Sequence, residues 1–295
     1  MDKKTFSQEV KDELCEVKFK EIEAVAELAA MILFGENIEN GKTFLRTDKA
    51  NVAARIQVIL RKAVNEEISI DILKGRRNFC VEISKQIAQR VGVYISNDGE
   101  IALDEDVYED DSAKRAFLRG AFIISGTITD PQKGYSCELL TYNENMSFLA
   151  ADILENFSIK ANTVKRNNYY VTYLKDKDSV SDFLNIIGAH KTMMDLMVTQ
   201  IEKDLNNRNN RASNCLAANM DKTISASAKQ CSAIVKLKES PIWDSLDETT
   251  KAIAELRLEY YDASLSAIGE RMTPKMSKSS VNRRMSKLIE ISNKA

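Results

Sequence analysis

The sequence has little histidine and no paired cysteines. His190 is the one histidine among 295 residues, so a multi-histidine metal site is excluded. No Cys-x-x-Cys pair occurs among the five cysteines, which are Cys15, Cys80, Cys137, Cys215 and Cys231. Single cysteines fit a reducing compartment and argue against both a disulfide framework and a zinc site. We therefore expect no metal and no cofactor, and His190 to be a structural or surface residue.

Long apolar runs are also missing. No segment reaches the roughly 18 apolar residues that a transmembrane helix requires. The first residues, MDKKTFSQEVKDELCE, are charged and follow the pattern of a helix, which differs from a secretion signal. We expect a cytoplasmic protein that has no membrane partner and no small-molecule substrate.

The charge is nearly balanced over the whole chain but uneven along it. The formal net charge is -2, and residues 98–111 are strongly acidic. From Arg271 to the last residue, seven lysines and arginines face a single acid, Glu290. Such a local excess of positive charge favours contact with the phosphates of a nucleic acid.

One order of helices and strands is predicted twice in the first 190 residues, after a first helix over 6–17. The first copy has a helix over 24–34, a strand over 43–47, a helix over 52–64 and hairpin strands over 68–73 and 79–84. The second has a helix over 115–125, a strand over 136–141, a helix over 146–157, hairpin strands over 159–165 and 169–174, and a helix over 180–187. Placing residues 28–38 over 118–128 aligns Ala30 with Gly120, a register of 90 residues. The matching order predicts an internal duplication.

Only helices are predicted after Gly188. They cover 193–205, ending in an Asn-rich turn over 206–210, and then 215–237, 246–260, 264–272 and 277–292. Ser264 and Ser277 are expected to cap the last two helices. The turn between these helices, 273–276, has the length found in a helix-turn-helix.

The last predicted helix has two different faces. Its apolar residues recur at helical spacing and are Val281, Met285, Leu288 and Ile289. The opposite face carries Ser279, Asn282, Arg283, Ser286 and Lys287. Arginine can bond to guanine and asparagine to adenine, while Lys278 and Ser280 near the helix start suit phosphate oxygens. From the pattern alone, a recognition helix and a solvated basic helix at the chain end are equally good interpretations.

Four segments resemble characteristic blocks of the WhiA family. They are FSQEVKDEL (6–14), AELAAMILFG (26–35), NCLAANMDKT (214–223) and ELRLEYYDASLSAIGERMTPKMSKSSVNRRMSKLIEI (255–291). The resemblance implies an α+β N-terminal domain over 1–190 with two αββαββα repeats similar to LAGLIDADG homing endonucleases, at about 20–95 and 112–190. A helical linker over 191–240 and an all-α helix-turn-helix domain over 241–295 would follow. Ala29, Ala30 and Gly120 would let the two motif helices pack closely.

The resemblance also locates a degenerate nuclease centre. The metal-binding acids of such endonucleases fall at Gly35 and Ser125 in this sequence, and neither residue offers a carboxylate. Glu36 lies one position away, so an endonuclease that uses this acid stays an alternative. The cations at the hairpin turns are candidates for secondary DNA contacts, because the hairpins of active relatives lie on DNA, but ordinary solvated surface is the favoured interpretation. These cations are Lys74, Arg76, Arg77, Lys165 and Arg166.

Together these observations predict a non-catalytic, sequence-specific protein that binds double-stranded DNA and associates with the nucleoid. The expected DNA-binding residues are Lys275, Lys278, Ser279, Ser280, Asn282, Arg283, Arg284 and Lys287. The resemblance to WhiA proteins implies a transcriptional regulator in cell division, chromosome segregation or sporulation, with transcription or cell-division proteins as further partners. Two alternatives are a metal-dependent endonuclease and a protein-interaction factor in division for which DNA is secondary.

Overall fold

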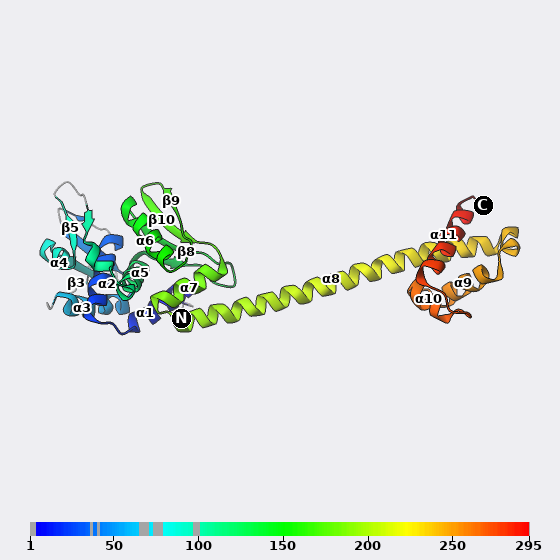
Figure 1. Cartoon of the computed structure of the whole chain (residues 1–295), viewed down its shortest axis with the longest axis horizontal. Coiled ribbons are helices and arrows are strands. Elements are labelled where there is room, and N and C mark those ends of the chain that lie inside the picture. The colour runs from blue at the N-terminus through cyan, green and yellow to red at the C-terminus, as the bar shows by residue number, and fades with distance from the viewer. Residues whose placement is uncertain are drawn as a thin grey trace. The chain divides into compact units, whose positions relative to one another are not determined.

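The computed structural model describes residues 4–35, 38–39, 42–64, 71–72, 79–96 and 101–294. The chain divides by contact into two compact units, Met1–Lys203 and Asp204–Ala295. Figure 1 shows both units and labels their α-helices and some of their strands. None of the helices formed by the described residues combines the length and the hydropathy needed to cross a bilayer.

The first unit contains the same order of elements twice. After α1 (Phe6–Glu16), the first repeat consists of α2 (Glu21–Gly35), β1 (Ile38–Glu39), β2 (Lys42–Thr47), α3 (Ala50–Val64), β3 (Asp71–Ile72), β4 (Phe79–Ile83) and α4 (Lys85–Arg90). The second consists of α5 (Asp111–Ser125), β7 (Thr127–Ile128), β8 (Cys137–Thr141), α6 (Glu144–Asn156), β9 (Asn162–Arg166), β10 (Tyr169–Leu174) and α7 (Lys177–Ile187). The antiparallel sheets have the equivalent orders β1-β2-β4-β3 and β7-β8-β10-β9. The predicted duplication and the αββαββα order are confirmed.

The segment between the repeats has more structure than the sequence predicted. β5 (Val93–Ile95) pairs with β6 (Ile101–Leu103), and a 3₁₀ helix, η1 (Glu105–Tyr108), follows. Although residues 98–111 are strongly acidic, Val107 among them lies in the core. A strand of three residues gives too short a pattern to be recognised from alternation alone.

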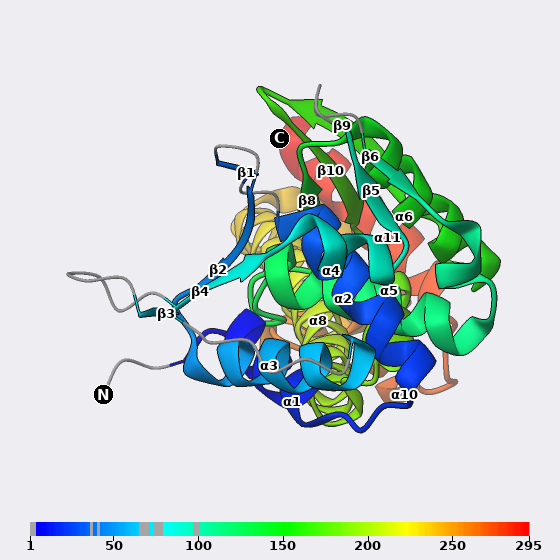
Figure 2. The same ribbon diagram turned by 90° about the vertical axis from the view of Figure 1, so that its left-hand side faces the viewer.

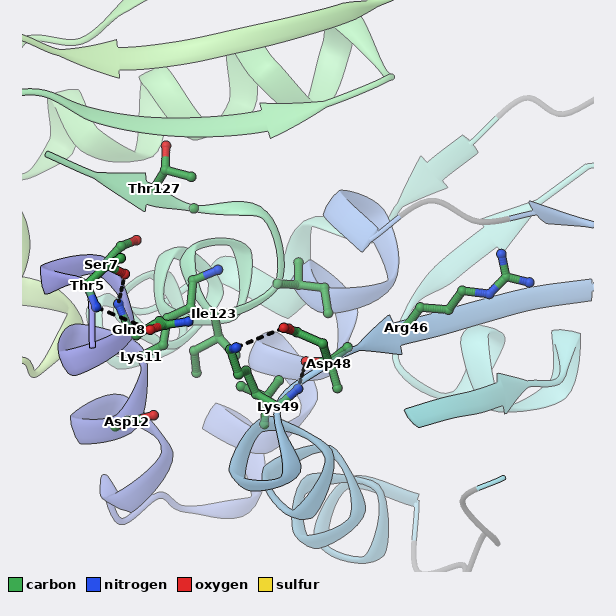
Figure 3. Close-up of a pocket in the computed structure, with 14 residues that line it drawn as sticks. Thr5, Ser7, Gln8, Lys11, Asp12, Arg46, Asp48, Lys49, Ile123 and Thr127 are labelled. Carbon is green, nitrogen blue, oxygen red and sulfur yellow. Dashed lines mark hydrogen bonds and ion pairs between the residues drawn. The ribbon is translucent and has the colours of Figure 1, made fainter. Parts of the chain in front are cut away.

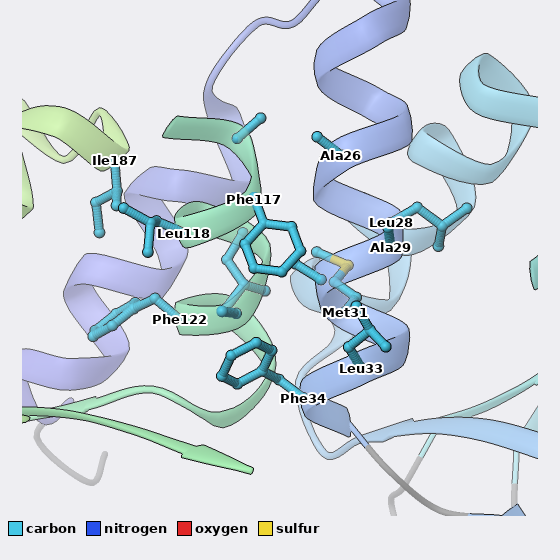
Figure 4. Packing of buried hydrophobic residues seen from close by; sticks show 14 of the residues in the cluster. Ala26, Leu28, Ala29, Met31, Leu33, Phe34, Phe117, Leu118, Phe122 and Ile187 are labelled. Carbon is cyan, nitrogen blue, oxygen red and sulfur yellow. The ribbon is translucent and has the colours of Figure 1, made fainter. Parts of the chain in front are cut away.

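Helices α2 and α5 pack side by side at the centre of this unit, with more contact than any other pair of elements (Figures 1 and 2). A Cβ atom added to Gly120 of α5 would lie 2.3 Å from the carbonyl oxygen of Glu27 in α2. Figure 4 shows Phe34 and Phe117 filling the space between the helices, with ring centroids 6.1 Å apart. The small residues thus allow the close approach that was predicted.

A buried ion network crosses the same helix pair. The Glu27 carboxylate accepts hydrogen bonds from Arg55 Nε at 2.9 Å and Nη2 at 2.8 Å, and from Arg119 Nε at 2.8 Å. Arg55 Nη1 also donates to the carbonyl oxygens of Cys15, at 3.4 Å, and Val17. Because a buried charge is costly unless it is paired, these bonds hold α2, α3 and α5 in one arrangement.

The second unit is entirely helical over its described residues. Its elements are the later part of α8 (His190–Lys238), η2 (Pro241–Ser245), α9 (Glu248–Glu259), α10 (Leu265–Arg271) and α11 (Lys278–Lys294). Ile234 and Leu237 of α8 join the core formed by α9, α10 and α11. The predicted turn over 206–210 is wrong, because α8 runs through it. Relative to alanine, an asparagine reduces helix stability by only about 0.7 kcal/mol or less. No Gly or Pro interrupts residues 206–210, so the helix continues through them.

We expect Glu27→Gln to destabilise the first unit by about 3 to 5 kcal/mol, because two arginines would lose their buried counter-charge. Urea unfolding followed by circular dichroism measures this change. Glu21→Gln removes an exposed acid from the same helix and should change stability by less than about 0.5 kcal/mol. Equal stability of the two variants would contradict a structural role for the network.

Candidate nucleic-acid interface

Helices α10 and α11 form the predicted helix-turn-helix. Ser264 caps α10 through a hydrogen bond from Ala267 N, and Ser277 caps α11 through one from Ser280 N. The turn folds back tightly, since Met276 N donates to the carbonyl oxygen of Gly269 at 3.0 Å. A Cβ atom on Gly269 would lie 2.3 Å from the carbonyl oxygen of Met276. Only glycine therefore fits in α10 at this position.

The two faces of α11 differ as predicted. Val281, Met285 and Leu288 are buried in the core of the unit, and Ile289 is half-buried beside them. The exposed face carries Ser279, Asn282, Arg283, Ser286 and Lys287. Since the apolar face is fixed against α9 and α10, the polar face has a defined direction.

Several polar groups gather at the start of α11. Ser277 Oγ lies 2.9 Å from Ser279 Oγ and 3.0 Å from Ser280 Oγ. Lys275 and Lys278 are exposed on either side of this hydroxyl cluster. Free backbone N–H groups in the first turn of a helix attract anions, and the nearby ammonium groups add to that attraction.

Arg284 differs from its neighbours on α11. Its Nη1 donates to Asp247 Oδ1 at 2.9 Å and to Thr250 Oγ1 at 2.7 Å, so the side chain joins α11 to the start of α9. A hydrogen bond from Thr250 and the charge of Arg284 lower the pKa of the Asp247 carboxyl below its ordinary value. Arg284 is therefore engaged within the unit, and no local pattern indicates a partner 37 residues away.

Arg257 is a second structural arginine that sequence reasoning missed. Its Nη1 donates to the carbonyl oxygens of Tyr260 and Tyr261, both at 3.3 Å, and of Ala263 at 2.7 Å. These bonds close the end of α9 and the loop to α10 around a fully buried guanidinium. Its position within an apolar helical run was the available signal, because an arginine there needs buried acceptors.

The hairpin cations of the first unit are only partly described. Arg166 pairs with Glu138 through Nη1 at 3.2 Å and Nη2 at 3.1 Å, while the ammonium of Lys165 lies 5.2 Å from the centre of the Tyr170 ring. The first-repeat cations lie outside the described residues and are Lys74, Arg76 and Arg77. No geometry therefore bears on those three residues.

The last described residues of the two motif helices, Gly35 and Ser125, carry no carboxylate. Gly35 ends α2, where a Cβ atom would lie 2.9 Å from Leu45 Cδ2, and Ser125 ends α5 with its hydroxyl donating to the carbonyl oxygen of Ala121 at 3.1 Å. Glu36 lies outside the described residues. Within the residues that the structure describes, no three His, Cys, Asp or Glu side chains are grouped so that they could hold a metal ion.

Comparison with known proteins agrees with both halves of this fold. Residues 114–206 match the WhiA LAGLIDADG-like domain, and residues 209–292 match the WhiA C-terminal HTH domain. A protein named probable cell division protein WhiA from Ruminiclostridium cellulolyticum is 35% identical over 302 residues, covering 97% of this chain and 96% of its own. The chain belongs to the WhiA family.

Other WhiA proteins show the same extent of similarity. A probable cell division protein WhiA from a Thermoanaerobacter species is 34% identical and covers 98% of both chains. The crystal structure of full-length WhiA from Thermatoga maritima has a TM-score of 0.62 at 23% identity and covers 99% of both chains. That structure therefore supports the fold of the whole chain.

We expect Gly269→Ala to destabilise the second unit by about 2 kcal/mol, because the added methyl group meets backbone atoms of the turn. Trp243 packs against this core and is the one tryptophan in the sequence, so its fluorescence reports unfolding of the second unit. Ser266→Ala, at an exposed position of the same helix, should leave the transition unchanged. A Gly269→Ala protein as stable as wild type would show that the turn has room for a side chain.

Arg284→Ala should lower the stability of the second unit, because it removes the ion pair with Asp247. The loss should be only about 1 kcal/mol, because Asp247 is largely exposed to solvent. Lys287→Ala, on the exposed face of the same helix, should change it by less than about 0.5 kcal/mol. The same tryptophan signal in a urea titration compares the two variants. The reverse order would place the structural contact at Lys287.

Proposed function

We propose that this WhiA-family protein is a non-catalytic, sequence-specific regulator that binds double-stranded DNA through α11. The observation that carries the proposal is the exposed polar face of a helix whose opposite face is fixed in a core. A recognition helix needs both properties, because its side chains must reach base edges from a defined direction.

The residues of α11 and the preceding turn take different roles in this proposal. Arg283 and Asn282 contact bases, as their bidentate hydrogen-bonding groups allow. The cations and hydroxyls that contact phosphates are Lys275, Lys278, Ser279, Ser280 and Lys287. Arg284, which is bonded to Asp247, positions α11 and contacts DNA only at the backbone.

The first unit would act without cleaving DNA. Gly35 and Ser125 supply no carboxylate for a divalent cation, which phosphodiester cleavage by such enzymes requires. Lys165 would be a secondary phosphate contact from the hairpin, with Arg166 beside it restrained by Glu138. The family relationship supports a regulatory role in cell division, chromosome segregation or sporulation, on the nucleoid in the cytoplasm.

Binding to pooled genomic fragments tests the proposal. We expect wild-type protein to select a subset of fragments, with an affinity that falls steeply as salt rises. An Asn282→Ala, Arg283→Ala double variant should lose at least about tenfold in affinity for that subset. As a control, Asn293→Ala with Lys294→Ala removes an amide and a cation from the other end of α11 and should keep selective binding.

Each other outcome points to a different function. Selective binding that survives in the Asn282→Ala, Arg283→Ala variant would move recognition to the first unit. Magnesium-dependent nicking of the fragments would contradict the non-catalytic proposal. A wild-type protein that binds no fragment would favour an interaction factor for division proteins.

A further inference from the structure

A pocket of about 460 Å³ opens in the first unit. It lies between α1, the turn from β2 to α3, and the end of α5 with the start of β7 (Figure 3). Polar residues from three separate segments line it, among them Thr5, Ser7 and Lys11 of the α1 region and Thr47 of β2. No function proposed above uses these residues.

The hydroxyl groups of this pocket are set up as hydrogen-bond donors. Thr5 Oγ1 accepts from Gln8 N at 3.3 Å, Ser7 Oγ accepts from Ile128 N at 3.3 Å, and Thr47 Oγ1 accepts from Lys49 N at 3.2 Å. A hydroxyl whose oxygen already accepts a bond keeps its proton to donate elsewhere. The pocket therefore offers several O–H donors to a ligand that accepts.

The acids that line the pocket already have partners. Asp48 pairs with Lys49 at 2.8 Å, and Asp12 accepts from Lys4 at 2.5 Å and from Asn51 at 2.6 Å. These contacts offset the negative charge that would otherwise repel an anion. In Figure 3 the guanidinium of Arg46, at the other edge of the pocket, points away from Lys11.

Lys11 is the cation left without a counter-charge at close range. Within the described residues its ammonium makes no hydrogen bond or ion pair and lies 5.9 Å from the centre of the Phe122 ring. Burial lowers the pKa of Lys11 to about 8, against the opposing effects of Asp48, Cys15 and Cys137 and with a small contribution from Lys49. At neutral pH it is therefore mostly charged and incompletely solvated.

We propose that this pocket binds a phosphate group, held by the Lys11 ammonium and by the hydroxyls of Thr5, Ser7 and Thr47. A phosphate has several acceptor oxygens and a charge that matches an ammonium beside hydroxyl donors. The pocket is larger than a phosphate ion, so the group can belong to a bigger molecule. Its source is either a free phosphate compound or the backbone of DNA, and the experiment separates the two.

The affinity for phosphate should depend on pH in a range set by Lys11. The charged lysine binds the anion, and its pKa is depressed in the empty pocket, so affinity is greatest below pH 8. Above pH 8 the Lys11 ammonium of the empty pocket loses its proton, so the affinity for phosphate should fall by up to about tenfold for each pH unit. An ordinary lysine would keep its affinity to a much higher pH.

Titration of the full chain with inorganic phosphate, followed by calorimetry at pH 7 and pH 9, tests the site. We expect binding at pH 7 that weakens at pH 9 and is lost by about tenfold or more in Lys11→Met, with partial retention in Lys11→Arg. Lys18→Met removes an exposed lysine just beyond α1 and should bind as wild type. Circular dichroism verifies that each variant is folded.

A short DNA duplex identifies the source of the phosphate. Phosphate that stays bound when duplex is added indicates a free compound. Displacement of bound phosphate by the duplex indicates the DNA backbone. So does a lower affinity of Lys11→Met for the duplex, whether or not free phosphate binds. Two results would overturn the proposal. In the first, Lys11→Met and wild type bind phosphate equally well. In the second, wild type binds no phosphate and Lys11→Met has the same affinity for duplex as wild type. The phosphate result does not depend on whether α11 recognises DNA.

Discussion

The first unit depends on one buried acid, Glu27. Its carboxylate meets arginines from α3 and α5, and these arginines extend to the carbonyl oxygens of Cys15, Val17 and Ile187. One residue of α2 therefore fixes four other parts of the unit. Apolar contacts alone would permit the helices to slide, whereas buried ionic hydrogen bonds are satisfied in a single register. The close contact of Gly120 with the backbone of Glu27 is likewise possible in a single register of the two helices.

In the second unit, too, charged side chains hold helices together, and here they fix the position of the helix that carries the candidate interface. Arg257 closes the loop after α9, and Arg284 joins α11 to the start of α9. Both arginines help to fix the orientation of α11 within the unit, while Asn282 and Arg283 stay exposed on its outer face. Basic residues that are adjacent in sequence thus divide into those that build the interface and those that it presents.

The sequence predicted the repeated order of elements, the helix-turn-helix and the two faces of α11, because periodicity and Ser capping are local signals. Short strands such as β5 and β6 carry too few residues to give such a signal. The role of Arg284 depends on Asp247, a partner supplied only by the folded chain. Likewise, Thr5, Lys11 and Thr47 have ordinary local patterns, and only folding brings them to one pocket.

The ion network also bears on how a duplicated protein evolves. In the 90-residue register of the motif helices, Glu27 corresponds to Phe117 and Arg119 to Ala29. Neither Glu27 nor Arg119 therefore has an equivalent in the other repeat. Two copies of the first repeat would hold two Glu27 carboxylates that keep Arg55 but lack Arg119. Two copies of the second repeat would hold Arg119 without its acid. Only the pairing of the two different halves completes the network, so the duplicated unit has lost the symmetry that an assembly of identical repeats would need.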